Sequence, residues 1–118
     1  MENNKDVLNI IFKVRDEIEY DVNEVGIVTI FEKQDHKIQK LFRKLKFKIP
    51  MYRKIELDEY SSTVFLEIDG KKTVMDIGEK LESKFGDKVS PIYERLLVFL
   101  NHIDSNCKYI EKINFKKK

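Results

Sequence analysis

The stretch that decides the fold reads LDEYSSTVFLEIDGKKTVMDIGEKLESKFGDKVSPIYERLLVFLNHID and occupies residues 57–104. Its apolar residues recur three and four positions apart in three separate segments, which is the period of an α-helix. Because loops of a few residues allow each helix to pack only on its neighbour, the sequence predicts a compact three-helix unit over residues 58–105. The apolar positions, segment by segment, are Tyr60, Val64, Phe65 and Ile68; Val74, Ile77, Leu81 and Phe85; and Ile92, Leu96, Phe99, Leu100 and Ile103.

Each predicted helix has its own start signal. Asp58 precedes the first helix, where its carboxylate can accept hydrogen bonds from free backbone N–H groups. Thr73 is followed three residues later by Asp76, which is a variant of the capping box. The third helix is expected to have Ser90 as its cap and Pro91 as its first helical residue.

The chain before this unit is rich in strand signals. Residues 17–21 alternate apolar and acidic side chains, residues 23–24 are turn formers, and residues 26–31 are β-branched or aromatic apart from the first. These features predict a hairpin. Residues 52–57 form the third predicted strand and lead directly into the first helix. The fold class expected is therefore α+β, with a three-stranded antiparallel sheet followed by the three-helix unit.

Three further segments complete a single domain over residues 1–118. Residues 7–14 are apolar and β-branched, which indicates an edge strand or an extended arm. In residues 36–46, apolar side chains at helical spacing alternate with lysines and arginines, which predicts a short basic helix within the β-rich region of residues 1–57. The C-terminal extension 106–118 alternates again and indicates a short return strand.

Bulk composition favours a soluble, heavily charged protein. The chain has 118 residues, of which 42% are hydrophobic and 37% are charged. No apolar run has the length of a membrane span, and the first residues lack the features of a secretion signal, so the expected location is cytoplasmic. The single cysteine, Cys107, fits a reducing compartment and is expected to be a small apolar filler.

Charge is distributed unevenly along the chain despite a net charge of only +2. Residues 1–32 are mainly acidic, whereas residues 33–54 are strongly basic and contain one acid, Asp35. The two segments could lie side by side as solvated faces that neutralise each other. Alternatively, the basic segment is a patch that attracts an acidic peptide or a nucleic acid.

The sequence contains few groups that could carry out chemistry. The two histidines, His36 and His102, have no partners at metal-ligand spacing, and His102 and Cys107 form only a single pair. The four glycines are too far apart for a phosphate loop, and Gly78 is expected to allow close packing between helices. The sequence therefore predicts no catalytic residue, metal or cofactor, and indicates a binding protein.

The order of these elements resembles the PqqD-like family. In that family a strand is followed by Leu-Asp and an aromatic residue, a helix ending in Ile-Asp-Gly, Thr-Val opening a second helix, and a longer third helix. Here the matching runs are Ile55–Tyr60, Val64–Val74, Ile77–Leu81 and Tyr93–Leu96. The resemblance covers about residues 50–106. It implies a winged helix-turn-helix-like fold.

The resemblance also implies a function. PqqD-like proteins have no chemistry of their own; they bind the leader region of a ribosomally made precursor peptide and present it to a maturation enzyme, often a radical S-adenosylmethionine enzyme. The leader adds as a strand to the edge of the third strand and packs beside the third helix. On this chain that edge maps to Tyr52, Arg53, Lys54, Ile55 and Glu56, and the groove wall maps to Tyr93, Leu97 and Asn101.

Several alternatives remain open at this level. Tyr93 and Leu97 could instead be covered by the basic helix or by the return strand. The unpaired edge of the third strand could join two copies into a homodimer. A winged-helix unit can also bind DNA through its third helix, although Arg95 is the only fixed cation among the polar residues of that helix. The third class of function is a subunit that only stabilises a larger enzyme.

Overall fold

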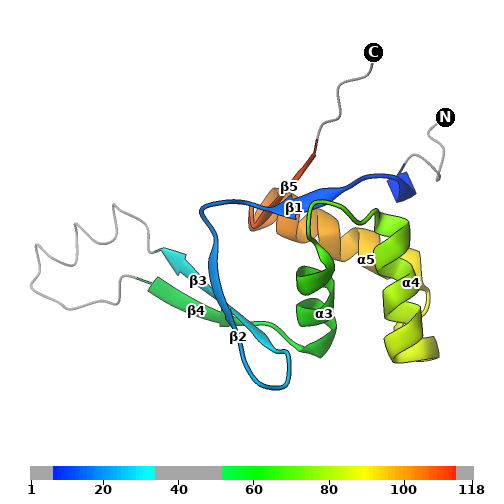
Figure 1. Ribbon diagram of the computed structural model, residues 1–118, viewed down its shortest axis with the longest axis horizontal. Coiled ribbons are helices and arrows are strands. Elements are labelled where there is room, and N and C mark those ends of the chain that lie inside the picture. The colour runs from blue at the N-terminus through cyan, green and yellow to red at the C-terminus, as the bar shows by residue number, and fades with distance from the viewer. Residues whose placement is uncertain (1–6, 34–51, 114–118) are drawn as a thin grey trace, which may run out of the picture.

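The protein is an α+β domain that contains two small sheets and a helical unit (Figure 1). The computed structural model describes residues 7–33 and 52–113. Within these ranges, the elements in chain order are β1 (Phe12–Val14), β2 (Glu19–Val22), β3 (Val28–Lys33), β4 (Tyr52–Glu56), α3 (Glu59–Glu67), α4 (Val74–Phe85), a 3₁₀ turn (Gly86–Val89), α5 (Ile92–Asn101), a π-type turn (His102–Asn106) and β5 (Ile110–Lys112).

Strands β2, β3 and β4 form the predicted three-stranded antiparallel sheet, in that order. The predicted hairpin is confirmed, and its turn is closed by Asn23, whose side-chain oxygen accepts hydrogen bonds from the backbone N–H groups of Val25 and Ile27. Gly26 in this turn has a φ of 87°, a conformation that glycine adopts without steric penalty. Ile30 pairs with Tyr20 on one side and with Ile55 on the other, and its side chain is fully buried.

The predicted three-helix unit is also confirmed. Asp58 caps α3 by accepting a hydrogen bond from the Ser61 N–H, and Thr73 and Asp76 form the reciprocal capping box at the start of α4. In Figure 1, α3 stands between the three-stranded sheet and α4. Because Ser62 Oγ accepts a hydrogen bond of 2.9 Å from the Val28 N–H, α3 is tied to the central strand through a buried polar contact.

The expected start of the third helix is wrong by one residue. Helix α5 begins at Ile92, and Pro91 occupies the capping position without a side-chain hydrogen bond. Ser90 does not act as the cap, because its N–H donates to the Asp87 carbonyl and thereby closes the 3₁₀ turn that precedes the helix. Leu96, Leu100 and Ile103 are buried as predicted, so the periodicity located the core face of this helix correctly.

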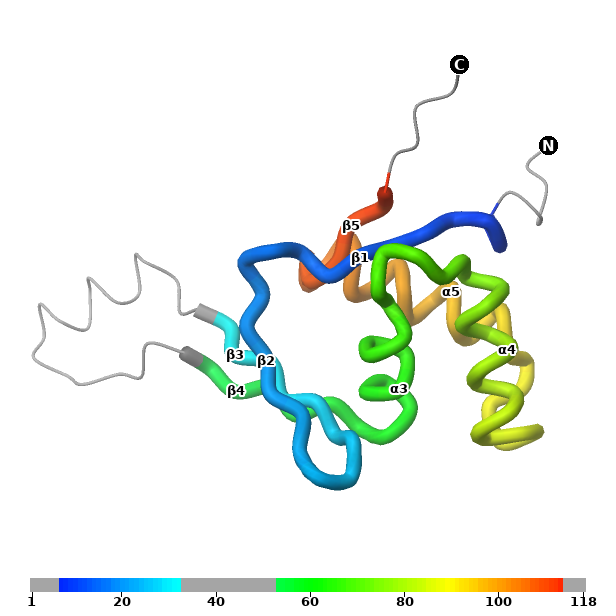
Figure 2. Tube along the Cα trace, in the orientation of Figure 1, coloured from blue at the N-terminus to red at the C-terminus, as the bar shows by residue number. Residues whose placement is uncertain are grey.

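The segment 7–14 and the C-terminal extension meet each other. Strand β1 pairs antiparallel with β5, with Phe12 opposite Lys112 and Val14 opposite Ile110. Figure 2 shows the two strands side by side, away from the three-stranded sheet. Residue 11 adds an isolated bridge to Thr73, and the Ile10 carbonyl accepts a hydrogen bond from the Val74 N–H, so this segment also covers the start of α4.

The basic helix expected at residues 36–46 falls outside the described residues, as does most of the basic segment 33–54. In the described ranges of the chain, no helix has the length and apolar character required to cross a bilayer.

Candidate functional site

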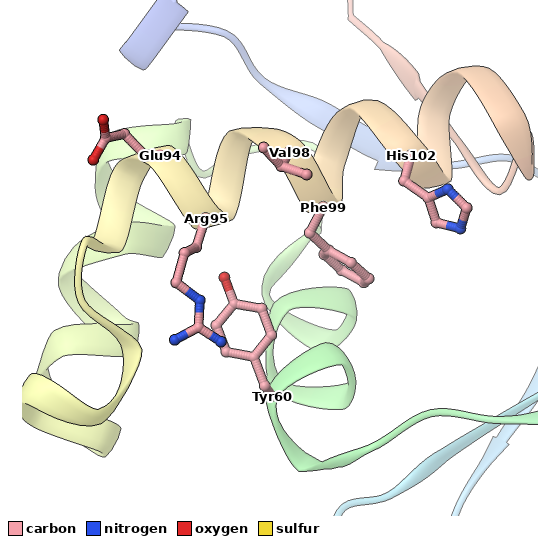
Figure 3. A pocket seen from close by; sticks show the side chains of 6 residues that line it. All are labelled: Tyr60, Glu94, Arg95, Val98, Phe99 and His102. Carbon is pink, nitrogen blue, oxygen red and sulfur yellow. The ribbon is translucent and has the colours of Figure 1, made fainter.

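An open apolar pocket lies between α5 and the first turn of α3. It has a volume of about 530 Å³ and is lined by Tyr60, Glu94, Arg95, Val98, Phe99 and His102. Tyr60 points up from α3, and Arg95, Phe99 and His102 point from α5 and its π-type continuation toward the side on which Tyr60 lies, whereas Glu94 points away from it (Figure 3). Val98 is 71% exposed. We call this hollow the α5 pocket.

The floor of the α5 pocket is built from aromatic rings. The Tyr60 ring lies 6.0 Å from the Phe99 ring in an edge-on arrangement and 6.2 Å from the Phe85 ring. Such aromatic contacts hold the rings in fixed orientations. A side chain that enters the pocket would therefore meet a preformed apolar floor.

Arg95 places a positive charge over this floor. Its guanidinium carbon lies 5.3 Å from the centre of the Tyr60 ring, and Nη1 donates a hydrogen bond of 3.1 Å to the Lys88 carbonyl. The Tyr60 hydroxyl is buried and has no hydrogen-bond partner among the described residues. Burial raises the pKa of Tyr60, and this effect exceeds the opposing effect of the nearby Arg95 charge. Tyr60 is therefore neutral at physiological pH.

A second pocket, which we call the polar pocket, meets the α5 pocket at His102. Its volume is about 590 Å³, and it extends to the sheet. Its lining residues are Glu17, Ile18, Phe31, Glu32, Arg53, His102, Asn106, Cys107 and Tyr109. The polar pocket includes one residue of β4, Arg53, whereas the α5 pocket is lined by residues of α3, α5 and the π-type turn.

Glu32 joins three regions of the molecule inside the polar pocket. Its carboxylate on β3 accepts a hydrogen bond of 2.8 Å from Arg53 on β4 and another from the buried Tyr109 hydroxyl. Burial raises the pKa of Glu32, but the hydrogen bonds from Tyr109 and Arg53 outweigh it and the net pKa is lowered. Burial together with the Glu32 hydrogen bond raises the pKa of Tyr109 well above its ordinary value. These two hydrogen bonds fix the distance between the sheet and the segment that follows α5.

Cys107 and His102 also face each other in the polar pocket. Cys107 Sγ lies 3.4 Å from His102 Nε2. Burial raises the pKa of the Cys107 thiol, which keeps it in the neutral form and makes it a poor nucleophile at neutral pH. Among residues 7–33 and 52–113, no group of three or more histidine, cysteine, aspartate and glutamate side chains is arranged to hold a metal ion.

One residue of the predicted strand edge, Arg53, lines the polar pocket. In the described ranges of the chain, β4 pairs with β3 on one side only, so its other edge carries unpaired backbone groups. The backbone of Tyr52 pairs with the backbone of Lys33. The side chains of Lys54 and Glu56 are exposed, and Ile55 is half-buried against the core. Arg53 points toward Glu32 and the polar pocket.

Tyr93 and Leu97, predicted as the groove wall, lie on the other side of α5 from Val98. They line a third hollow of about 250 Å³ together with Glu94, Val7 and Leu8, and both pack against the core. The Tyr93 hydroxyl donates a hydrogen bond of 3.2 Å to the Met75 carbonyl. The structure therefore does not bring Tyr93 and Leu97 together with β4 in one pocket.

Close packing at Gly78 accounts for the position of Tyr93. A Cβ atom added to this glycine would lie 2.2 Å from a carbon of the Tyr93 ring, so the absence of a side chain on α4 makes room for the ring. This confirms the packing role expected for Gly78. The predicted residue Asn101 is exposed, and its side-chain oxygen accepts a hydrogen bond of 3.4 Å from Ser105.

Sequence reasoning misses half of the stripe that lines the α5 pocket. Arg95, Val98, Phe99 and His102 follow one another at intervals of three, one and three residues, which is the spacing of a helix face. The sequence predicts a core position for Phe99 and a fixed cation at Arg95, but it assigns no binding role to Val98 or His102. The spacing could have revealed this stripe, but it is equally compatible with the stripe that contains Tyr93 and Leu97.

No protein-family model, no curated protein and no solved structure matches this chain. The function has to be inferred from the geometry of the site.

Proposed function

We propose that this protein is a peptide-binding module of the PqqD-like kind, without chemistry of its own, with a winged helix-turn-helix-like arrangement. Its ligand is the leader of a ribosomally made precursor peptide, which it presents to a maturation enzyme, such as a radical S-adenosylmethionine enzyme, in the cytoplasm. The observations that carry the proposal are an open apolar pocket on α5 and a β4 edge that is unpaired within the described residues; the polar pocket, which shares His102 with the α5 pocket, includes Arg53 of β4.

Strand addition to β4 supplies the first contribution to affinity. The free edge of β4 offers backbone N–H and C=O groups at alternate residues, and an extended peptide can pair with them. Each such hydrogen bond contributes about 0.5–1.5 kcal/mol in water. A strand of five residues therefore gives weak binding by itself.

The α5 pocket supplies the second contribution. An apolar side chain of the added strand would leave water and lie against Tyr60, Val98 and Phe99, and burial of one such side chain contributes about 1.5–3 kcal/mol. The loss of translational and rotational freedom on association opposes both contributions, so the net affinity is smaller than their sum. Arg95 at the pocket and Lys54 on the strand are placed to favour acidic residues that flank the buried side chain.

The groove that we propose differs from the one expected from the sequence. The wall of the α5 pocket is formed by Arg95, Val98, Phe99 and His102, whereas Tyr93 and Leu97 pack against α4 and the N-terminal segment. Val98 replaces Leu97 as the residue for a decisive mutation, because Val98 is exposed and Leu97 contributes to the core.

The test is a calorimetric titration with the N-terminal peptide encoded by a small open reading frame beside the gene. We expect one-to-one binding to the wild-type protein and its loss in Val98→Asp. Val25→Asp is the matched control, because Val25 is 80% exposed in the β2–β3 turn, away from the pocket. Normal binding by Val98→Asp, or an equal loss in both variants, would refute the proposed pocket.

A second titration tests strand addition directly. Methylation of the peptide backbone nitrogen at alternate positions removes the donors that an added strand needs, so one of the two alternate sets should abolish binding. Unchanged affinity for both sets would contradict strand addition. Salt-sensitive binding to duplex DNA without any peptide affinity would favour the nucleic-acid alternative, although Arg95 stands beside Glu94 on the exposed side of α5.

A further inference from the structure

The three-stranded sheet has a second edge, at β2, with a different character from β4. All four residues of β2 are exposed, and within residues 7–33 and 52–113 the strand pairs only with β3. Tyr20 is 41% exposed although its ring lies 4.8 Å from that of Phe65 on α3. Because side chains alternate along a strand, Tyr20 and Val22 face the helices, and Glu19 and Asp21 face the opposite side.

Charge distinguishes the two edges. Among the residues that the structure describes, no ion pair involves Glu19 or Asp21 on β2, and none involves Lys54 on β4. The register places Glu19, Phe31 and Lys54 in one row across the sheet. Lys54 therefore projects from the same face as Glu19 and Asp21, at the opposite edge. On this face β2 thus presents two acids and no cation, whereas β4 presents Lys54 together with Glu56.

We propose that two copies of this chain associate by pairing β2 of one copy with β4 of the other. If the two sheets continue with their helices on the same side, β2 and β4 run parallel, since both are antiparallel to β3. A register that puts Lys54 beside Asp21 of the second copy also puts Ile55 beside Val22 of the second copy. In that register Glu56 lies beyond the end of β2 and away from its acids.

The two symmetric pairings leave the acids of β2 without a cation. Pairing β2 with β2 brings Glu19 and Asp21 of both copies together, and like charges that face each other across strands are destabilising. Pairing β4 with β4 sets Lys54 against Lys54 or against Glu56, depending on the register, and does not involve β2. The head-to-tail contact gives the acids of β2 a cation, leaves one free edge of each kind and allows further copies to add.

This association does not depend on the peptide proposal, but it has a consequence for it. Both contacts would use the free edge of β4, so a β4 edge occupied by a second copy is closed to a peptide. Association would then keep the edge covered until a peptide of higher affinity displaces the second copy.

Sedimentation velocity of the full chain over a wide concentration range tests the inference. We expect the wild-type protein to form dimers and larger species as its concentration rises, and added salt to weaken them. Asp21→Lys and Lys54→Asp should each weaken association by about tenfold, because each places like charges across the contact. An equimolar mixture of the two variants should associate again, since a basic β2 then meets an acidic β4.

Glu79→Lys is the control, because it reverses an exposed charge on α4 at a distance from both edges. It should associate like the wild type. A wild-type protein that stays monomeric, single variants that associate normally, or a mixture that stays monomeric would each overturn the proposal. Since Asp21→Lys leaves β4 and the α5 pocket intact, its peptide titration separates failure of this inference from failure of the peptide proposal.

Discussion

Helix α5 carries apolar side chains on both sides of its buried face, but only one side is covered. On the covered side, Tyr93 fills the space above Gly78 and Leu97 contacts the N-terminal segment. On the open side, Val98 is largely exposed and Phe99 lines the α5 pocket together with Tyr60 of α3. The comparison shows that the spacing of apolar residues along a helix identifies its buried face and the two flanks beside that face. Segments that are distant in the sequence determine which of the two flanks stays exposed.

The largest effect is expected on the covered side. Leu97→Asp would place a carboxylate among Val7, Leu8 and the core, and should lower the free energy of unfolding by about 2–4 kcal/mol. Urea denaturation followed by circular dichroism measures this loss. A change below the error of the method would mean that Leu97 is open to solvent, as the sequence predicts for the groove wall.

The next effect tests the hydrogen bond between Glu32 and Tyr109, which connects the sheet to the segment that follows α5. Tyr109→Phe removes the hydrogen bond to Glu32 and should lower the free energy of unfolding by about 1–2 kcal/mol at neutral pH. Denaturation curves should show this loss without a change of fold. A variant as stable as the wild type would mean that the hydroxyl contributes nothing.

The same variant should change the dependence of stability on acid. Because the pKa of Glu32 is lowered in the folded state, its contribution is complete above the ordinary value of 4.5 and is lost as the pH falls through the lower folded value. Tyr109→Phe should therefore lose less stability on acidification than the wild type. Melting temperatures between neutral and strongly acidic pH compare the two, and parallel curves would contradict the assignment.

A smaller effect is expected at Gly78. Alanine favours a helix over glycine by about 1 kcal/mol, but a Cβ atom at this position would displace the Tyr93 ring. Gly78→Ala should therefore lower stability by about 1 kcal/mol in the wild type, as overpacking does. In a Tyr93→Ala background the same change should raise stability. A double-mutant cycle without coupling would show that the ring does not need this space.

The smallest effect on stability is expected on the open side. Val98→Asp exchanges an exposed residue and should change the free energy of unfolding by about 0.5 kcal/mol or less. Paired with Leu97→Asp in the same denaturation experiment, it contrasts neighbouring residues on opposite flanks. A large loss for Val98→Asp would show that the open side is also covered.

The sequence predicts local features better than contacts between distant segments. Asp58, Thr73 and Asp76 can be identified as caps because a cap depends on residues three positions apart. The predicted start of α5 is misplaced because Ser90 also ends the preceding 3₁₀ turn, and that use of its N–H is not visible in a capping signature.

The candidate site is predicted only partially. Strand β4 can be located from its composition and from its position before Asp58, but the hairpin does not reveal that β4 pairs with β3 rather than with β2. The sequence does not reveal which flank of α5 stays exposed. The answer depends on where Val7 and Leu8 pack and on the Glu32–Tyr109 contact, which joins residues 77 positions apart. The spacing of apolar residues within one segment carries no information about contacts between segments that are distant in the sequence.

The pairing of β1 with β5 also determines how the domain would respond to force. Phe12 lies opposite Lys112, so the chain enters β1 and leaves β5 at the same end of the pair. Tension applied through the two ends would open this short ladder one residue pair at a time, as a zipper opens, rather than shear it.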